Sequence, residues 1–231
     1  MAMTTSAARP FRAVPELQNG DHLSREEFER RYDAMPELKK AELIEGVVHM
    51  SSPVRQTQHA GPHFQLITWL GHYCVFSPGV IGGDNGTLRL DLDNEPQPDA
   101  YLFIDPVSGG QAGIDVEGYV ESAPELVAEV AASSASYDLH TKHSVYRRNQ
   151  VREYFVWRVL DQAIDWFVLR GSKFEQLLPD EKGILRSEIL PGLWLDTQAL
   201  LDGNLPQVFA VVQQGLATPE HAAFVARLQK R

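Results

Sequence analysis

The chain has 231 residues, of which 43% are hydrophobic, and its 31 Asp and Glu against 21 Lys and Arg give a formal net charge of −10. This length and composition predict a real hydrophobic core, and we expect one domain because no Pro/Ser-rich linker divides the middle. The negative charge argues against a protein whose main task is to coat nucleic acid, since phosphate neutralisation needs Lys and Arg. It remains compatible with an enzyme that has a local basic groove.

A single cysteine, Cys74, excludes an intramolecular disulfide and a zinc site built from several cysteines. The N-terminus has no apolar stretch typical of a signal peptide, and no apolar run approaches the ~20 residues of a membrane helix. The sequence therefore predicts a soluble, cytoplasmic protein without a membrane partner. We expect a loosely ordered tail over 1–20, a main domain over 21–203 and a C-terminal helical extension over 204–231.

Residue periodicity and turn signals predict the order of the secondary-structure elements. The expected elements are a helix over 24–34, a hairpin with strands 42–44 and 47–50, a helix within 56–76, strands over 86–92, 98–104 and 125–131, a helix over 136–149, a strand over 153–159, a hairpin with strands 164–169 and 174–178, an edge strand over 184–189, and helices over 196–201, 205–214 and 219–229. This order is typical of an α/β fold with a mixed sheet.

Two details of this pattern matter later. Within 56–76, a stripe of apolar residues at helical spacing predicts the helix. That stripe consists of Phe64, Ile67, Leu70, Tyr73 and Cys74. The Gly-rich stretch 79–86 matches neither a Walker nor a Rossmann pattern, and we assign no element to it.

Two acidic residues lie in apolar, strand-like runs. Asp99 directly precedes Ala-Tyr-Leu-Phe-Ile, and Glu129 lies inside Leu-Val-Ala-Glu-Val-Ala. Burying an acid is costly unless it is paired or holds a metal. Two such acids on neighbouring strands, with Lys142 shortly after, predict a Mg²⁺ site for phosphodiester chemistry.

The order of these motifs resembles the PD-(D/E)XK restriction-endonuclease-like superfamily and, more specifically, the Uma family of putative restriction endonucleases. The resemblance covers roughly 38–201 and depends on the joint order of several short motifs. These are Glu42-Leu-Ile-Glu-Gly-Val-Val-His-Met-Ser, Gln97-Pro-Asp-Ala, Pro124-Glu-Leu-Val-Ala-Glu-Val, Asp138 with Lys142 and Tyr146, Val151-Arg-Glu-Tyr-Phe, and Leu190-Pro-Gly-Leu-Trp-Leu.

The resemblance implies a restriction-endonuclease-like mixed sheet flanked by helices, with an N-terminal helix, extra hairpins and C-terminal helices added to it. It implies that Asp99 and Glu129 ligate Mg²⁺, for which Mn²⁺ can substitute. Glu42 would complete the inner or outer shell of the metal. Lys142 would orient the attacking water or stabilise charge in the transition state. DNA is the implied substrate, and a homodimer is expected by analogy with nucleases that cut two strands.

The chain departs from the family pattern in three places. The superfamily lysine two residues after the second acid is replaced by Ala131, and the lysine role moves to Lys142 on the next helix. The usual Ser-Pro-Ser is here Ala131-Ala-Ser-Ser134, and the usual Val-Asp-Pro is replaced by Trp157-Arg-Val-Leu-Asp161. We expect these changes to affect loops and substrate binding more than the fold.

Each candidate residue also has a purely structural interpretation. Asp99 could cap a turn before a strand. Glu129 could form a structural ion pair with Lys142 or an arginine, and Lys142 could form an exposed i,i+4 pair with Asp138. Of the histidines, His59 and His63 fit the surface or the rim of an active site better than a metal centre. His140 and His143 flank Lys142 and could border the site, but they fit solvent-facing helix positions better.

Three functional hypotheses follow from the sequence. The leading one is a metal-dependent endonuclease that hydrolyses DNA through Asp99, Glu129, Lys142 and Glu42. The second is a catalytically inactive relative that acts as a homodimeric binding or assembly module, which the acidic net charge and the missing Ser-Pro-Ser favour. The third is a metal-dependent hydrolase of a small phosphorylated substrate.

Overall fold

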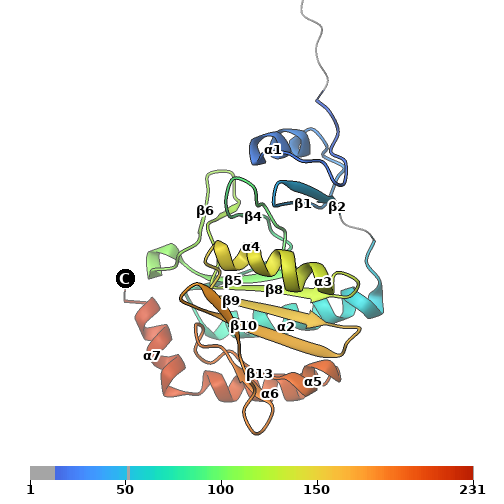
Figure 1. Cartoon of the computed structure of the whole chain (residues 1–231). Coiled ribbons are helices and arrows are strands. Elements are labelled where there is room, and N and C mark those ends of the chain that lie inside the picture. The colour runs from blue at the N-terminus through green and yellow to red at the C-terminus, as the bar shows by residue number, and fades with distance from the viewer. Residues whose placement is uncertain (1–13, 51–52, 231) are drawn as a thin grey trace, which may run out of the picture.

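The computed structural model describes residues 14–50 and 53–230 (Figure 1). Residues 1–13 of the predicted tail lie outside this range. Within 14–20, Leu17 is buried and the Gly20 N–H donates to the Val48 carbonyl at 2.8 Å. Residues 14–20 therefore lie against the N-terminal hairpin, which differs from the prediction of a loose tail, because Leu17 joins a small apolar cluster with Phe28.

Helices occur in the described residues at nearly all the places that the sequence predicts. They are α1 Arg25–Asp33, α2 Gly61–Phe76, α3 Ala135–Tyr137, α4 His143–Arg148, α5 Thr197–Leu201, α6 Leu205–Leu216 and α7 Pro219–Leu228. A π-helical turn precedes α2 at Gln56–Ala60, and another joins α3 to α4 at Asp138–Lys142. None of these helices is both long and apolar enough to span a membrane.

The strands form one large sheet and three small ones. They are β1 Ala41–Ile44, β2 Val47–Met50, β3 Val80–Asp84, β4 Leu88–Arg89, β5 Ala100–Ile104, β6 Gly113–Ile114, β7 Val120–Glu121, β8 Leu126–Ala131, β9 Glu153–Arg158, β10 Ala163–Arg170, β11 Lys173–Gln176, β12 Ile184–Arg186 and β13 Trp194–Asp196. The large sheet has six strands in the order β11-β10-β9-β8-β5-β3. Only β8 and β9 pair in parallel, so the sheet is mixed as predicted.

Helices cover both faces of the large sheet (Figure 1). The segment α3–α4 covers one face, and α2 with α5 and α6 lies on the other. Because successive side chains of a strand point to opposite faces, the sheet contributes to two separate cores. Along β8, Ala128 and Val130 join the core under α2, whereas Val127 and Ala131 join the core under α4.

The region 56–92 differs from the sequence pattern in two respects. The sheet buries Leu66, Trp69, Leu70 and Tyr73 of α2, while Phe64 of the apolar stripe is 67% exposed. Apolar residues occur on several sides of α2, so their spacing alone does not determine which side meets the sheet. The strand predicted over 86–92 is reduced to β4 in a small sheet with β7 and β6.

The edge strand β3 was not predicted, because its Gly82-Gly83 pair hides the usual strand signal. Packing explains Gly83: a Cβ atom there would lie 2.0 Å from the ring of Tyr101. A glycine in a strand interior often marks such a close approach.

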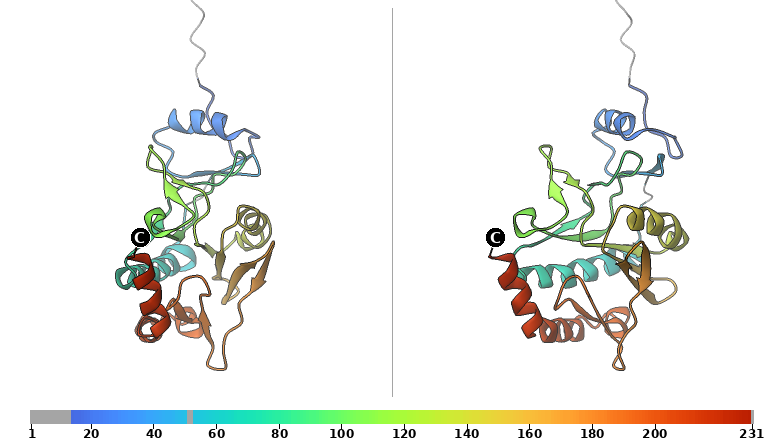
Figure 2. Two further views of the ribbon diagram at one scale, coloured as in Figure 1. Left: turned by 90° about the vertical axis from the view of Figure 1, so that its left-hand side faces the viewer. Right: turned by 60° about the vertical axis from the view of Figure 1, so that its left-hand side comes forward.

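The C-terminal helices are part of the main core and do not form a separate extension. Val208 and Val212 of α6 and Phe224 and Leu228 of α7 are buried in the same apolar cluster as Trp69 of α2. The predicted boundary at residue 203 therefore does not separate two cores. The N-terminal hairpin and α1 have their own small cluster above the large sheet (Figure 2).

Candidate active site

Asp99, the residue directly before β5, lies beside Glu129 of the neighbouring strand β8. Strands β5 and β8 pair with Ala100 opposite Ala128, so the antiparallel register places Asp99 opposite Glu129. The Asp99 N–H donates to Glu129 Oε2 at 3.4 Å, and the Val130 N–H donates to Asp99 Oδ2 at 2.8 Å. Both side chains are buried on the sheet face under α4. The two acids predicted from the sequence are thus brought together.

Lys142 connects this pair of strands to the N-terminal hairpin. Its Nζ atom donates to Glu129 Oε1 at 2.9 Å and to Glu42 Oε1 at 2.8 Å. Lys142 and Glu129 are each 4% exposed and Glu42 is 7% exposed. The alternative of an exposed Lys142–Asp138 pair is therefore wrong, whereas the buried pair with Glu129 is present.

Two further donors hold the carboxylates in place. The Tyr146 hydroxyl donates to Glu129 Oε1 at 2.9 Å, and the Gln97 N–H donates to Glu42 Oε1 at 2.8 Å. Lys142 and Tyr146 are four residues apart and both reach Glu129, one from the end of the π-helical turn and one from α4. π-helical turns are rare and are frequent at functional sites.

Asp99 is also contacted from the cleft side by the two histidines that the sequence placed at a surface or rim, and by Lys40, which the sequence did not single out. His59 Nε2 lies 3.2 Å from Asp99 Oδ2, and Lys40 Nζ lies 3.8 Å from Asp99 Oδ1. His63 Nε2 lies 2.9 Å from the Asp99 carbonyl oxygen and 3.1 Å from Asp84 Oδ1, so it carries a proton and donates. The i,i+4 spacing of the histidines was the signal in the sequence, and the intervening Gly61-Pro62 obscured it.

The remaining histidines and serines have lesser roles. His143 packs against Phe167 and Phe174, away from the carboxylates, and His140 is exposed. Ser133 and Ser134 line the cleft.

A cleft of about 760 Å³ opens beside Asp99. Among its lining residues are Lys40, Arg55, His59 and His63. No acidic side chain of the described residues lines this cleft. The chain thus has a local basic groove although its net charge is negative.

The pKa values of the two acids are shifted in opposite directions. Burial would raise the pKa of Asp99, but the hydrogen bond and charge of His59, with Lys40 and the Val130 N–H, lower it to about 2. Burial raises the pKa of Glu129, the charges of Asp138, Asp99 and Glu42 raise it further, and Lys142 opposes this. Neighbouring groups whose pKa values are pushed apart are typical of catalytic sites.

The pKa of Lys142 is raised well above its usual value. Burial acts to lower it, but the charges of Glu129, Glu42 and Asp138 outweigh burial. We use the name acidic cluster for Glu42, Asp99, Glu129 and Asp138, which are all at least nine-tenths buried around this one buried ammonium. Negative charge therefore exceeds positive charge in the interior of the site.

The acidic cluster suits a divalent cation that completes its shell with water. In the described residues, no three His, Cys, Asp or Glu side chains are arranged to hold a metal by themselves. Mg²⁺ in phosphoryl-transfer sites needs only one or two carboxylates. Asp99 Oδ1 accepts no hydrogen bond from the described residues, and Glu129 Oε2 accepts only the long one at 3.4 Å. These two oxygens fit the ligand set of such an ion.

Comparison with known proteins places the chain in a family. The model of a family described as putative restriction endonuclease, Uma2, matches residues 25–198. A putative nuclease of the DUF820 family from Anabaena variabilis has a similar structure, with a TM-score of 0.55 and 14% sequence identity over 75% of this chain and 96% of that chain. No curated protein matches the sequence. Because the family model spans the chain from α1 into α5 and includes the whole acidic cluster, this chain belongs to the Uma2 family.

Proposed function

We propose that this protein is a metal-dependent endonuclease that hydrolyses phosphodiester bonds in DNA. The observation that carries the proposal is the pair Asp99 and Glu129, each with an oxygen available to a metal, beside a cleft lined by Lys40, Arg55 and two histidines. The basic lining attracts a phosphate backbone, and the acids attract a cation that neutralises the reacting phosphate.

In the proposed reaction, each residue of the site has a separate role. Asp99 and Glu129 would hold Mg²⁺, with Mn²⁺ as a substitute. The bound ion would supply Lewis acidity and lower the pKa of a water molecule. His59 orients the Asp99 carboxylate through Oδ2, so that Oδ1 stays available. Lys142 orients Glu129 through Oε1 and places a fixed positive charge next to the reacting centre.

Glu42 acts on the site through Lys142. Its carboxylate bridges the ammonium and the Gln97 N–H, which fixes the position of Lys142 over the sheet. We therefore assign Glu42 a positioning role. This modifies the expectation that it completes the shell of the metal.

Family membership supports DNA as the substrate over a small phosphorylated compound. The Uma2 model is described as a putative restriction endonuclease, and the similar structure is titled a putative nuclease. The cleft of about 760 Å³ is partly open to solvent, and such a cleft suits a polymer better than an enclosed pocket would.

A plasmid-nicking assay tests the proposal. Supercoiled plasmid is incubated with wild type in Mg²⁺, Mn²⁺ or EDTA, beside Asp99→Asn, Glu129→Gln and the control Glu175→Gln. Glu175 is exposed on β11, so Glu175→Gln makes the same chemical change outside the site. We expect metal-dependent nicking by wild type and control, and a loss of roughly 100-fold or more in the two site variants.

Calorimetric titration with Mn²⁺ separates the alternatives. We expect binding by wild type and loss of binding in Glu129→Gln. Nicking that persists in both Asp99→Asn and Glu129→Gln would overturn the site assignment. Folded wild type that binds no Mn²⁺ and nicks nothing would favour the non-catalytic binding module. Binding without nicking would favour a small phosphorylated substrate.

A further inference from the structure

One side of the molecule, formed by α2 and β3, exposes apolar groups without a partner in the described residues. Phe64 is 67% exposed and Val75 is 75% exposed, and both lie on α2. In the left-hand view of Figure 2, α2 lies at the left margin of the molecule. We call this surface the β3–α2 face and define it by Phe64, Ile67, Gly71, Cys74 and Val75 of α2 with Gly82 of β3.

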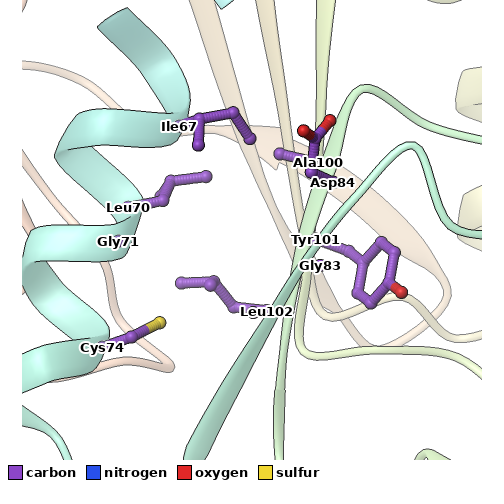
Figure 3. Close-up of a pocket in the computed structure, with 10 residues that line it drawn as sticks. Ile67, Leu70, Gly71, Cys74, Gly83, Asp84, Ala100, Tyr101 and Leu102 are labelled. Carbon is purple, nitrogen blue, oxygen red and sulfur yellow. The ribbon is translucent and has the colours of Figure 1, made fainter. Parts of the chain in front are cut away.

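A shallow apolar pocket of about 210 Å³ lies between the two elements (Figure 3). Figure 3 shows Ile67, Leu70 and Cys74 projecting from α2 toward the strands, with Leu102 projecting from β5 toward them. Gly71 and Gly82 both line this pocket, so the two glycines lie close to each other across it. Phe64, Ile67 and Cys74 of the apolar stripe of α2 therefore lie on this surface, while Tyr73 of the same stripe is buried.

Within 14–50 and 53–230, the backbone of β3 also has no hydrogen-bonding partner strand on its outer side. β3 pairs with β5 alone, at the end of the large sheet. The Asp105 N–H donates to the Gly79 carbonyl at 2.9 Å, which makes these two residues a hydrogen-bonded pair. Because hydrogen-bonded pairs alternate along an antiparallel ladder, Ile81 and Gly83 bond to β5. Gly82 then directs both its N–H and its C=O outward.

The two edges of the large sheet are built differently. The outer strand β11 carries Lys173 and Glu175, both exposed, and charged residues are a usual protection against edge-to-edge pairing. Strand β3 reads Val-Ile-Gly-Gly-Asp, without lysine, proline or a bulge, and its one charged residue, Asp84, is the last residue of the strand. The β3 edge can therefore pair with another strand, whereas the β11 edge is protected by its charged residues.

We propose that the β3–α2 face binds a second copy of this chain. Strand β3 pairs antiparallel with the same strand of the second copy, about a two-fold axis near Gly82, and the two large sheets become one. Identical strands in antiparallel register are self-complementary, which is the requirement for an isologous dimer. The two outward groups of Gly82 bond to the same two groups of its copy.

The helices fit this arrangement. Gly71 lies across the pocket from Gly82 and therefore near the axis, so the two α2 helices cross where neither has a side chain. Phe64 and Val75 lie on either side of Gly71 and contact the copy of α2 beyond the crossing. Helices with small residues at the crossing approach to the lower end of the usual interaxial range of roughly 8–10 Å. This inference does not depend on the proposed nuclease activity.

The variants Gly71→Arg and Val75→Glu test the proposal by sedimentation equilibrium. A Cβ atom at Gly71 meets nothing within 4 Å, and Val75 is 75% exposed, so neither change disturbs the folded chain. Leu178→Glu is the matched control, because Leu178 is 80% exposed and lies after β11 at the opposite edge. We expect wild type and control at twice the chain mass, and both β3–α2 variants at the mass of one chain with unchanged circular dichroism.

Hydrogen exchange tests the strand pairing itself. We expect the Gly82 amide to exchange slowly in concentrated wild type and quickly in Gly71→Arg. Wild type at the mass of one chain up to about 100 μM, a dimer that persists in both variants, a control that also dissociates, or a fast Gly82 amide in the dimer would each overturn the proposal.

Discussion

At the scale of single residues, Lys142 is the group on which the candidate site depends. It is the only Lys or Arg among the buried residues of the described chain and neutralises two buried carboxylates. Above about pH 8, where Glu129 is ionised, Lys142→Met would leave both Glu42 and Glu129 with a buried charge and without this partner. Breaking a buried ion pair in this way costs about 3–5 kcal/mol, so we expect a loss of that size in the free energy of unfolding, measured with urea.

Two further variants make this experiment specific. Lys173→Met removes an exposed lysine from β11 and should change the free energy of unfolding by less than about 0.5 kcal/mol. Adding Glu129→Gln to Lys142→Met should recover part of the lost free energy of unfolding, because one of the two unpaired buried charges is removed. A loss below about 1 kcal/mol in Lys142→Met would mean that the acidic cluster does not need the ammonium.

The raised pKa of Glu129 predicts that metal binding depends on pH. A protonated carboxyl is a poor ligand, so the apparent Mn²⁺ affinity should rise with pH until Glu129 is ionised. Burial and the neighbouring acids raise the pKa of Glu129 to about 8, so the affinity should still increase between roughly pH 6 and 8, where an ordinary glutamate is already ionised. Calorimetry at a series of pH values measures this rise.

Calorimetry on variants at the same series of pH values shows which carboxyl group causes the rise in Mn²⁺ affinity. Asp99 should contribute no slope in this range, because its pKa is lowered to about 2. Glu129→Gln should bind weakly at every pH and lose the slope. An affinity that is level from pH 6 to 8 in wild type would show that Glu129 is already ionised at pH 6.

At the scale of elements, one glutamate joins strand β9 to the turn after β12. Glu153 is fully buried and accepts hydrogen bonds from the Trp166 indole and the Ser187 hydroxyl at Oε2, and from the N–H groups of Glu188 and Ile189 at Oε1. In Glu153→Ala these four donors lose their acceptor inside the protein. We expect a loss of about 2–4 kcal/mol in the free energy of unfolding.

Urea denaturation with the exposed control Glu175→Ala measures this contribution. The control should stay within about 0.5 kcal/mol of wild type. The Trp166 indole gives a second readout, because its fluorescence should change in folded Glu153→Ala when its partner is removed. A variant as stable as wild type would mean that water replaces the carboxylate without cost.

At the scale of the whole molecule, the C-terminal helices belong to the core although the family match ends at residue 198. His221 Nδ1 of α7 donates to the Leu216 carbonyl, so Nε2 accepts from the buried Ser77 hydroxyl at the end of α2 at 2.9 Å, and Leu228 packs beside Gly79. Ending the chain after Gly203 would expose the buried side of α2, including Trp69. We expect this truncation to lose cooperative unfolding.

Truncation is compared with the full chain by circular dichroism, thermal melting and limited proteolysis. A shorter deletion, of residues 229–231, is the control, because it removes only residues after the end of α7. A truncated chain that melts cooperatively near the wild-type temperature would restore the interpretation of 204–231 as a separate extension.

The sequence by itself determined the features whose signals are local. The capping box placed the start of α1, where the Ser24 hydroxyl accepts from the Glu27 N–H. The β1–β2 turn was also predicted, and Glu45 and Gly46 have the positive φ angles of 53° and 72° that a tight hairpin turn requires. The alternation along the strands and the order of the motifs were enough to place Glu129 on β8 and Asp99 at the start of its neighbour, although β5 begins one residue later, at Ala100.

Only the tertiary structure decided the features that join distant segments. Lys142 and Glu42 are 100 residues apart, and His59 and Asp99 are 40 apart, so neither contact produces a local periodic signal. The buried side of α2 depends on where the sheet lies, because the helix is apolar on more than one side. Strand β3 exists because β5 offers it a ladder and Tyr101 requires a glycine beside it. Long-range packing therefore built both the basic cleft and the open sheet edge.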